Sequence, residues 1–138
     1  MDNLVVKGHV MKQSDFQFQY PCLDKMNFTV NHEFNSDKTE IEMANSFNIE
    51  VKKDASAKTA NVALILKVNE NKVDTPFQME AVISSDFRWS IEDEKKIDRM
   101  LETNAPALLL SYLRPIVANL TALAKMPPYH LPFFDFTK

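Results

Sequence analysis

The stretch NAPALLLSYLRPIVANLTALA, residues 104–124, predicts a long helix that is apolar on almost every side. Its main stripe follows helical spacing and consists of Leu109, Leu113, Ile116, Leu120 and Leu123. Other apolar residues widen this stripe past one face, and Arg114 is the only charge. Such a helix is buried on two sides, one of which can be its own sheet. A chain of 138 residues has no second layer for the other side, so we expect the stripe to form an interface with another copy.

The preceding part of the chain reads as strands joined by short polar turns. In SDFQFQYP, residues 14–21, aromatic residues fall on one face and glutamines on the other, which is the period of a half-buried strand. We expect residues 4–11 to belong to the same strand. Further strands are predicted at residues 41–51, 61–68 and 76–89, with a polar, turn-rich connection over residues 27–38. Four strands in this order predict an antiparallel meander.

The last third of the chain changes to a helical period. Ser90 is a suitable N-cap for a short helix over residues 91–102. The long helix then begins at Asn104 or Ala105, with Pro106 in its first turn, where a missing N–H costs nothing. Pro115 removes a hydrogen bond inside that helix and is expected to kink it.

After the helices the chain carries KMPPYHLPFFDFTK, residues 125–138, which is rich in proline and aromatic residues. Proline fixes φ, so we expect this segment to run extended as a strap over residues 126–138. The whole chain is then one domain over residues 1–138, with strands within about 4–89 and helices over about 91–125. The predicted class is α+β, a four-stranded antiparallel sheet with helices packed on one face.

Composition narrows the range of functions. The net charge of −3 argues against nucleic-acid binding and against an anionic membrane surface, because both favour a basic protein face. The helical stretch is interrupted by a charge and a proline, so we expect no membrane insertion. A single cysteine and the lack of a signal-peptide pattern are typical of the cytoplasm. The single glycine, Gly8, leaves most phosphate-binding and nucleophile-elbow motifs without their key residue.

No constellation points to catalysis. The histidines His9, His32 and His130 are scattered without the spacing of metal ligands, so no metal or other cofactor is expected. Cys22 paired with a histidine would be a nucleophile, but nothing in the pattern supplies an oxyanion hole. We expect a protein that is not an enzyme; a small-molecule enzyme using Cys22 or a histidine is the alternative, and the reactivity of Cys22 stays open.

The chain has more apolar stripes than one sheet face needs. Six residues from three predicted strands are the candidates for a surface groove: Phe47, Ile49 and Val51, with Phe16, Phe18 and Trp89 as weaker members. One interpretation is that all six residues belong to the core and to the oligomer interface. The functional alternative is a long apolar groove for non-native polypeptide, in which edge strands offer backbone pairing.

The C-terminal half resembles the SecB export-chaperone family. The resemblance rests on F-x-x-E at residues 77–80, on Phe87, and on P-x-x-L-x-x-Y-x-R at residues 106–114. It continues through M-P-P-Y-H-L-P-F-F-D-F at residues 126–136, without a gap from Phe77 onward. The stretch SDFQFQYP is similar to the first strand of the family.

This resemblance implies a long helix at a subunit interface, a homo-oligomer that is a dimer or a tetramer, and an ATP-independent holdase. The holdase would keep preproteins unfolded and pass them to the SecA motor. Asp15 and Glu80 fall on positions where the family carries acidic residues for SecA docking. The chain departs from the family at Gln19 and Gln78, and the family continues past Phe136 into a further helix and an acidic tail.

From these observations we predict a cytoplasmic, homo-oligomeric chaperone that binds unfolded or preprotein polypeptides without ATP. Two alternatives with the same fold remain. One is a structural or adaptor protein that holds no client, and the other is a chaperone dedicated to an aggregation-prone antitoxin. The residues do not identify the client, and they do not decide whether SecA binds.

Overall fold

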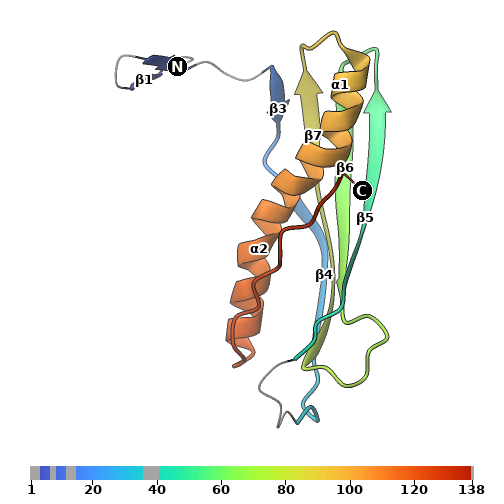
Figure 1. Ribbon diagram of the computed structural model, residues 1–138, viewed down its shortest axis with the longest axis vertical. Coiled ribbons are helices and arrows are strands. Elements are labelled where there is room, and N and C mark those ends of the chain that lie inside the picture. The colour runs from blue at the N-terminus through green and yellow to red at the C-terminus, as the bar shows by residue number, and fades with distance from the viewer. Residues whose placement is uncertain (1–3, 7–8, 12–14, 36–40, 138) are drawn as a thin grey trace.

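The computed structural model describes residues 4–6, 9–11, 15–35 and 41–137, and it consists of an antiparallel sheet with one long helix lying across it (Figure 1). The main sheet contains β3 (Phe16–Phe18), β4 (Cys22–Val30), β5 (Asn45–Asp54), β6 (Thr59–Val68) and β7 (Phe77–Trp89). The strand order is β3-β7-β6-β5. β4 follows β3 and also pairs with β7, along the earlier residues of that strand. The predicted α+β class with an antiparallel sheet and helices on one face is therefore confirmed.

The predicted number of strands is wrong, because the main sheet has five strands rather than four. The missing strand is β4, which covers part of the region assigned to a polar connection. Its register with β7 shifts between Leu23 and Lys25. This bulge interrupts the alternation of apolar and polar residues, so a period of two remains only over the short second half of the strand, from Met26 to Val30.

The chain before β3 also differs from its prediction. β1 (Leu4–Val6) and β2 (His9–Met11) pair with each other as a separate two-stranded antiparallel ribbon. They do not extend β3 along the main sheet, and Figure 1 shows the ribbon away from the rest of the domain.

Strict alternation along β6 and β7 builds the core. Even-numbered residues of β6 and odd-numbered residues of β7 are buried on the helix side of the sheet. The largest fully buried side chains on these two strands are Val62, Leu64, Leu66, Val68, Phe77, Ile83 and Phe87. The opposite face is polar around a small apolar centre, so the helix covers the only face that alternation makes fully apolar.

The two predicted helices are one continuous rod. It comprises α1 (Glu94–Arg99), a π-helical turn η1 (Met100–Asn104) and α2 (Ala105–Leu123) (Figure 1). Asp93 is the N-cap rather than Ser90, since its carboxylate accepts hydrogen bonds from the amides of Lys95 and Lys96 at 3.1 and 3.2 Å. Asn104 has helical dihedral angles and does not cap. The π-helical turn precedes Pro106, whose nitrogen carries no hydrogen, so the helix continues where a break was predicted.

This helix, Glu94–Leu123, is long and apolar enough to cross a membrane by length and composition. Core helices of soluble proteins satisfy the same criterion. Here Leu109, Leu113 and Val117 are completely buried against the domain's own sheet, which is the packing of a core helix.

With glycine almost absent, other residues take the positive φ angles that turns require: Lys58, Asn69, Asn71 and Lys125. Asn69 is fully buried, and its side chain connects the β6–β7 turn with the residue before β5 and with the first residue of β7. Its side chain accepts a hydrogen bond from the amide of Ala44 at 3.0 Å and donates one to the carbonyl of Phe77 at 2.9 Å. Asparagine tolerates this backbone conformation better than most residues, so it replaces glycine at the β6–β7 turn.

A Schellman motif ends α2 and directs the strap back along the helix. The amide of Met126 donates to the carbonyl of Thr121 at 3.2 Å, and the amide of Lys125 donates to the carbonyl of Ala122 at 3.0 Å. Lys125 lies in the left-handed region with φ of 62°. A residue with a Cβ is disfavoured there, and glycine is the usual occupant of this position.

We predict that Lys125→Gly raises the free energy of unfolding by about 0.5–1 kcal/mol, because it relieves the left-handed strain at the end of α2. Denaturant unfolding at equilibrium measures the change. The matched control is Ala124→Gly, at φ of −82°, which should lower stability instead. Destabilisation by Lys125→Gly would contradict the assignment of the turn.

Candidate functional site

One apolar surface lies on β5, on the side of the sheet that carries the helix. Phe47, Ile49 and Val51 alternate along this strand, opposite fully buried residues of β6. Phe47 and Val51 are nevertheless 38% and 37% exposed, and Ile49 is half-buried. In the described part of the chain, β5 pairs only with β6, so its outer backbone edge is free. The three residues, here called the β5 row, form an apolar surface beside an open strand edge.

The strap lies over one end of the β5 row. Phe134 stacks on the ring of Phe47 with 5.3 Å between the ring centroids. Phe136 meets the same ring edge-on at 4.8 Å, and the rings of Phe134 and Phe136 are 6.2 Å apart. Such aromatic pairs stabilise by about 0.5–1.5 kcal/mol each beyond their buried area. Phe47 is thus both a predicted binding residue and a contact of the chain's own strap.

The first half of the strap is anchored by polar contacts. The amide of Tyr129 donates to the hydroxyl of Thr121 at 2.8 Å, and its phenol donates to the side chain of Asn45 at 3.0 Å. The Nε of Arg114 donates to the carbonyl of Leu131 at 2.8 Å. Leu131 itself is fully buried in the core. These contacts connect the strap to α2 and to the start of β5.

The other three predicted groove residues lie at the opposite edge of the sheet. Phe16 stacks on Phe87 at 5.4 Å, and Phe18 contacts Phe87 and Tyr112 with 6.2 Å between ring centroids in each pair. Trp89 is only 6% exposed and belongs to the core. Three inter-strand spacings, about 14 Å, separate β3 from β5. The six candidates therefore form two patches rather than one continuous groove, and Trp89 adds little surface to either.

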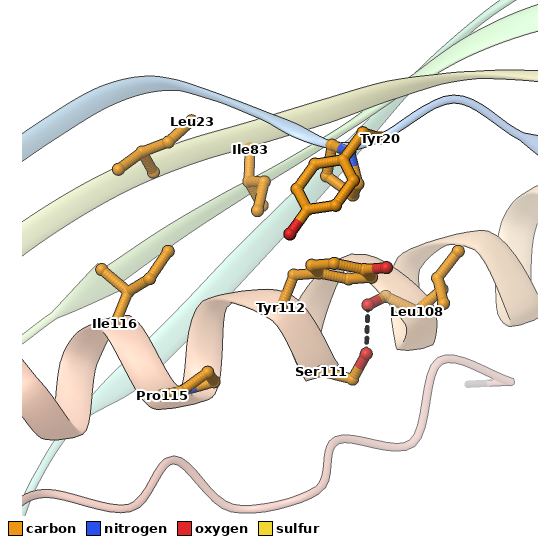
Figure 2. A pocket seen from close by; sticks show the side chains of 9 residues that line it. Tyr20, Leu23, Ile83, Leu108, Ser111, Tyr112, Pro115 and Ile116 are labelled. Carbon is orange, nitrogen blue, oxygen red and sulfur yellow. Dashed lines mark hydrogen bonds between the residues drawn. The ribbon is translucent and has the colours of Figure 1, made fainter.

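A pocket of about 630 Å³ adjoins the second patch, between the sheet with the β3–β4 connection and the side of α2 that faces them (Figure 2). Its walls include Leu23 and Ile83 from the sheet and Ile116 from the helix. Figure 2 shows Tyr20 above Tyr112, and their rings meet edge-on at 5.5 Å. The sequence prediction did not include this pocket. Its signal is the i, i+4 spacing of Leu108, Tyr112 and Ile116, which lie on the side of α2 next to the core stripe and face the β3–β4 connection.

The five residues predicted to form a subunit interface divide into two groups. Leu109 and Leu113 are fully buried against the sheet of their own chain, so a second copy cannot contact them. That part of the prediction is wrong, because the core stripe and the outer stripe overlap in the sequence. Ile116 and Leu120 are partly buried and Leu123 is 73% exposed. An interface on α2 would consist of these last three together with Leu108 and Tyr112.

The two predicted SecA-docking residues are far apart. The carbonyl of Asp15 accepts a hydrogen bond from the amide of Ser90, which follows β7 directly. Glu80 lies ten positions earlier on β7, about 33 Å away along the strand. Glu80 also forms an ion pair with Lys25 at 3.0 Å. The structure therefore does not bring the two carboxylates together.

Cys22 is exposed, and the neighbouring carboxylate of Asp24 raises the pKa of its thiol, first by a hydrogen bond and then by its charge. A raised pKa disfavours the thiolate, which is the reactive form. His32 and His130 are exposed and lie in separate loops. Among the residues that the structure describes, no three histidine, cysteine or acidic side chains gather as metal ligands would.

A family model described as preprotein translocase subunit SecB matches residues 13–138. No curated protein matches the chain.

Two solved structures are similar in fold. One is the SecB-like chaperone Rv1957 of Mycobacterium tuberculosis in complex with a ChAD peptide from the HigA1 antitoxin Rv1956, with a TM-score of 0.69 and 19% sequence identity. The match covers 88% of this chain and 91% of that one. The other is a protein of unknown function from Streptococcus agalactiae, with a TM-score of 0.52 and 17% identity, covering 86% and 97% of the two chains.

We predict that Leu123→Asp leaves the fold intact but lowers the mass of the assembly, because the side chain is exposed in the single chain and apolar enough to contact a partner. Light scattering measures the mass, and far-ultraviolet circular dichroism monitors the fold. Ala107→Asp places the same charge on an exposed position on another side of α2, away from these residues, and should change neither. Leu113→Asp should prevent folding, since it buries an unpaired charge. A monomeric wild-type protein would contradict the interface.

Proposed function

The chain belongs to the SecB family, and we propose that it is a chaperone that binds unfolded polypeptide without ATP. The observation that carries this proposal is the β5 row, an exposed apolar surface beside a free strand edge. Apolar side chains of a client would be buried there, at a gain of roughly 25 cal/mol for each Å² removed from water. The strand edge would add backbone hydrogen bonds that do not depend on sequence.

We infer that the protein is a homo-oligomer and that it is cytoplasmic, as the family resemblance implies. The part of α2 beside the core stripe, which ends at the exposed Leu123, offers the surface for a second copy, and several copies would present several β5 rows to one client. Many weak contacts along one client chain bind it tightly and without strict specificity. The raised pKa of the Cys22 thiol disfavours the thiolate that nucleophilic catalysis by this residue would need.

We also propose a role in protein export, in which SecA would dock at Glu80 and Asp15. The ion pair with Lys25 partly neutralises Glu80, and Asp15 is too distant to act with it. We therefore expect weaker attraction to SecA than two clustered carboxylates would give. Glu80→Gln should reduce any SecA binding that the protein has, measured by titration at low salt.

A dedicated antitoxin chaperone is the second candidate. It is favoured by the similarity in fold to Rv1957, which was solved with an antitoxin peptide. A panel of unrelated unfolded polypeptides separates the two candidates. Binding across the panel supports a general holdase, binding to one client supports the dedicated chaperone, and no binding at all supports an adaptor with no client.

We predict that the wild-type oligomer suppresses aggregation of a chemically denatured test protein on dilution, followed by light scattering. Val51→Asp should weaken client binding roughly tenfold, because it replaces an exposed apolar side chain of the β5 row by a charge. Val73→Asp is the control, since Val73 is exposed outside the strands and away from the row. Full aggregation at one oligomer per test protein would exclude holdase activity.

A further inference from the structure

The strap consists of two halves that are held in different ways. The first half ends at the fully buried Leu131 and is fixed by the hydrogen bonds of Tyr129 and Arg114 described above. Pro132 follows and carries no amide hydrogen. Beyond it, residues 133–137 contact the rest of the chain mainly through aromatic rings. The strap thus changes at Pro132 from an anchored segment to one that rests on a surface.

The second half forms few directional contacts with the domain. In the described part of the chain, its hydrogen bonds are local, from the amide and hydroxyl of Thr137 to the carboxylate of Asp135. Phe133 is 83% exposed and lies 4.3 Å from the guanidinium of Arg114. Phe134 and Phe136 rest on Phe47, which keeps more than a third of its own surface exposed. This half can therefore leave the β5 row without breaking the core or a backbone ladder.

Resting on the proposed function, we propose that Phe134–Asp135–Phe136 is a resident ligand of the β5 row, which a client displaces when it binds. The client segment would carry two aromatic side chains separated by one residue. That spacing is what the strap itself uses to place one ring flat on Phe47 and the other edge-on against it. We therefore expect the client segment to carry its aromatic residues in the same arrangement as the strap segment that it replaces.

Resident occupancy lowers apparent affinity. A client can bind only the fraction of molecules whose row is open, and its apparent dissociation constant rises in inverse proportion to that fraction. Segments without suitably spaced aromatic residues would not compete with the strap. The local turn around Asp135 holds the two rings ready to return once the client leaves.

The test compares the double variant Phe134→Ala/Phe136→Ala with the wild type. The probe is a fluorescent, reduced and carboxymethylated polypeptide that cannot fold, and the readout is fluorescence anisotropy. Loss of two aromatic pairs should open the row and lower the dissociation constant by about five- to hundredfold. Phe133→Ala is the matched control, because Phe133 lies over Arg114 and not on Phe47, and it should leave affinity unchanged.

A second measurement uses no client. A synthetic peptide of residues 132–137, PFFDFT, should bind the double variant more tightly than the wild type, and the same peptide with alanine in place of its second and third phenylalanines should bind neither. Equal or weaker binding of both the probe and the peptide to the double variant would overturn the proposal. If the peptide behaves as expected and no unfolded probe binds any form, the resident ligand stands and the chaperone function fails.

Discussion

The packing of α2 across β6 and β7 is the constraint on which the other features depend. These two strands alternate strictly, and Leu109, Leu113 and Val117 of the helix close their apolar face. A helix with its side chains is about 10 Å wide, whereas three inter-strand spacings already make this sheet about 14 Å wide. One helix therefore seals the centre and leaves the two flanks of the same apolar face half covered. The β5 row and the pocket beside Tyr112 lie on those two flanks.

The strap covers part of the sheet face that is too wide for the single helix to cover. It covers one flank with aromatic residues after the Schellman motif at Lys125 has turned the chain back. Its anchored half adds to the core through Leu131, and its second half lies on β5 without joining the sheet. The opposite flank has no equivalent cover within the described residues, and there the α2 side chains beside the core stripe are apolar and partly exposed. The two flanks thus differ in what lies over them, which supports separate roles in client binding and self-association.

Much of this arrangement could be predicted from the sequence, and the failures have identifiable causes. The central strand at residues 61–68 was predicted from its apolar run, and the long helix was predicted because its apolar residues keep helical spacing. β4 was missed because the bulge after Leu23 breaks its period, and the helix was divided because Pro106 resembles a start. The division of the apolar helix into a core stripe and a neighbouring, partly exposed stripe could not be derived, since leucine occurs in both. Which predicted groove residues share a surface depends on strand order, which a period of two does not encode.

The bulge in β4 has one more consequence. A protein that offers bare backbone to unfolded chains runs the risk of joining the aggregates it would prevent, because any exposed strand is a template for further pairing. On β4, the irregularity between Leu23 and Lys25 interrupts the regular backbone edge that another strand would need for pairing. On β5, the exposed Lys52 brings positive charge to the end remote from the strap, whereas Lys53 forms ion pairs with Glu94 and Asp98. Sheet growth from copy to copy is thereby discouraged at both margins, while the apolar middle of β5 stays accessible.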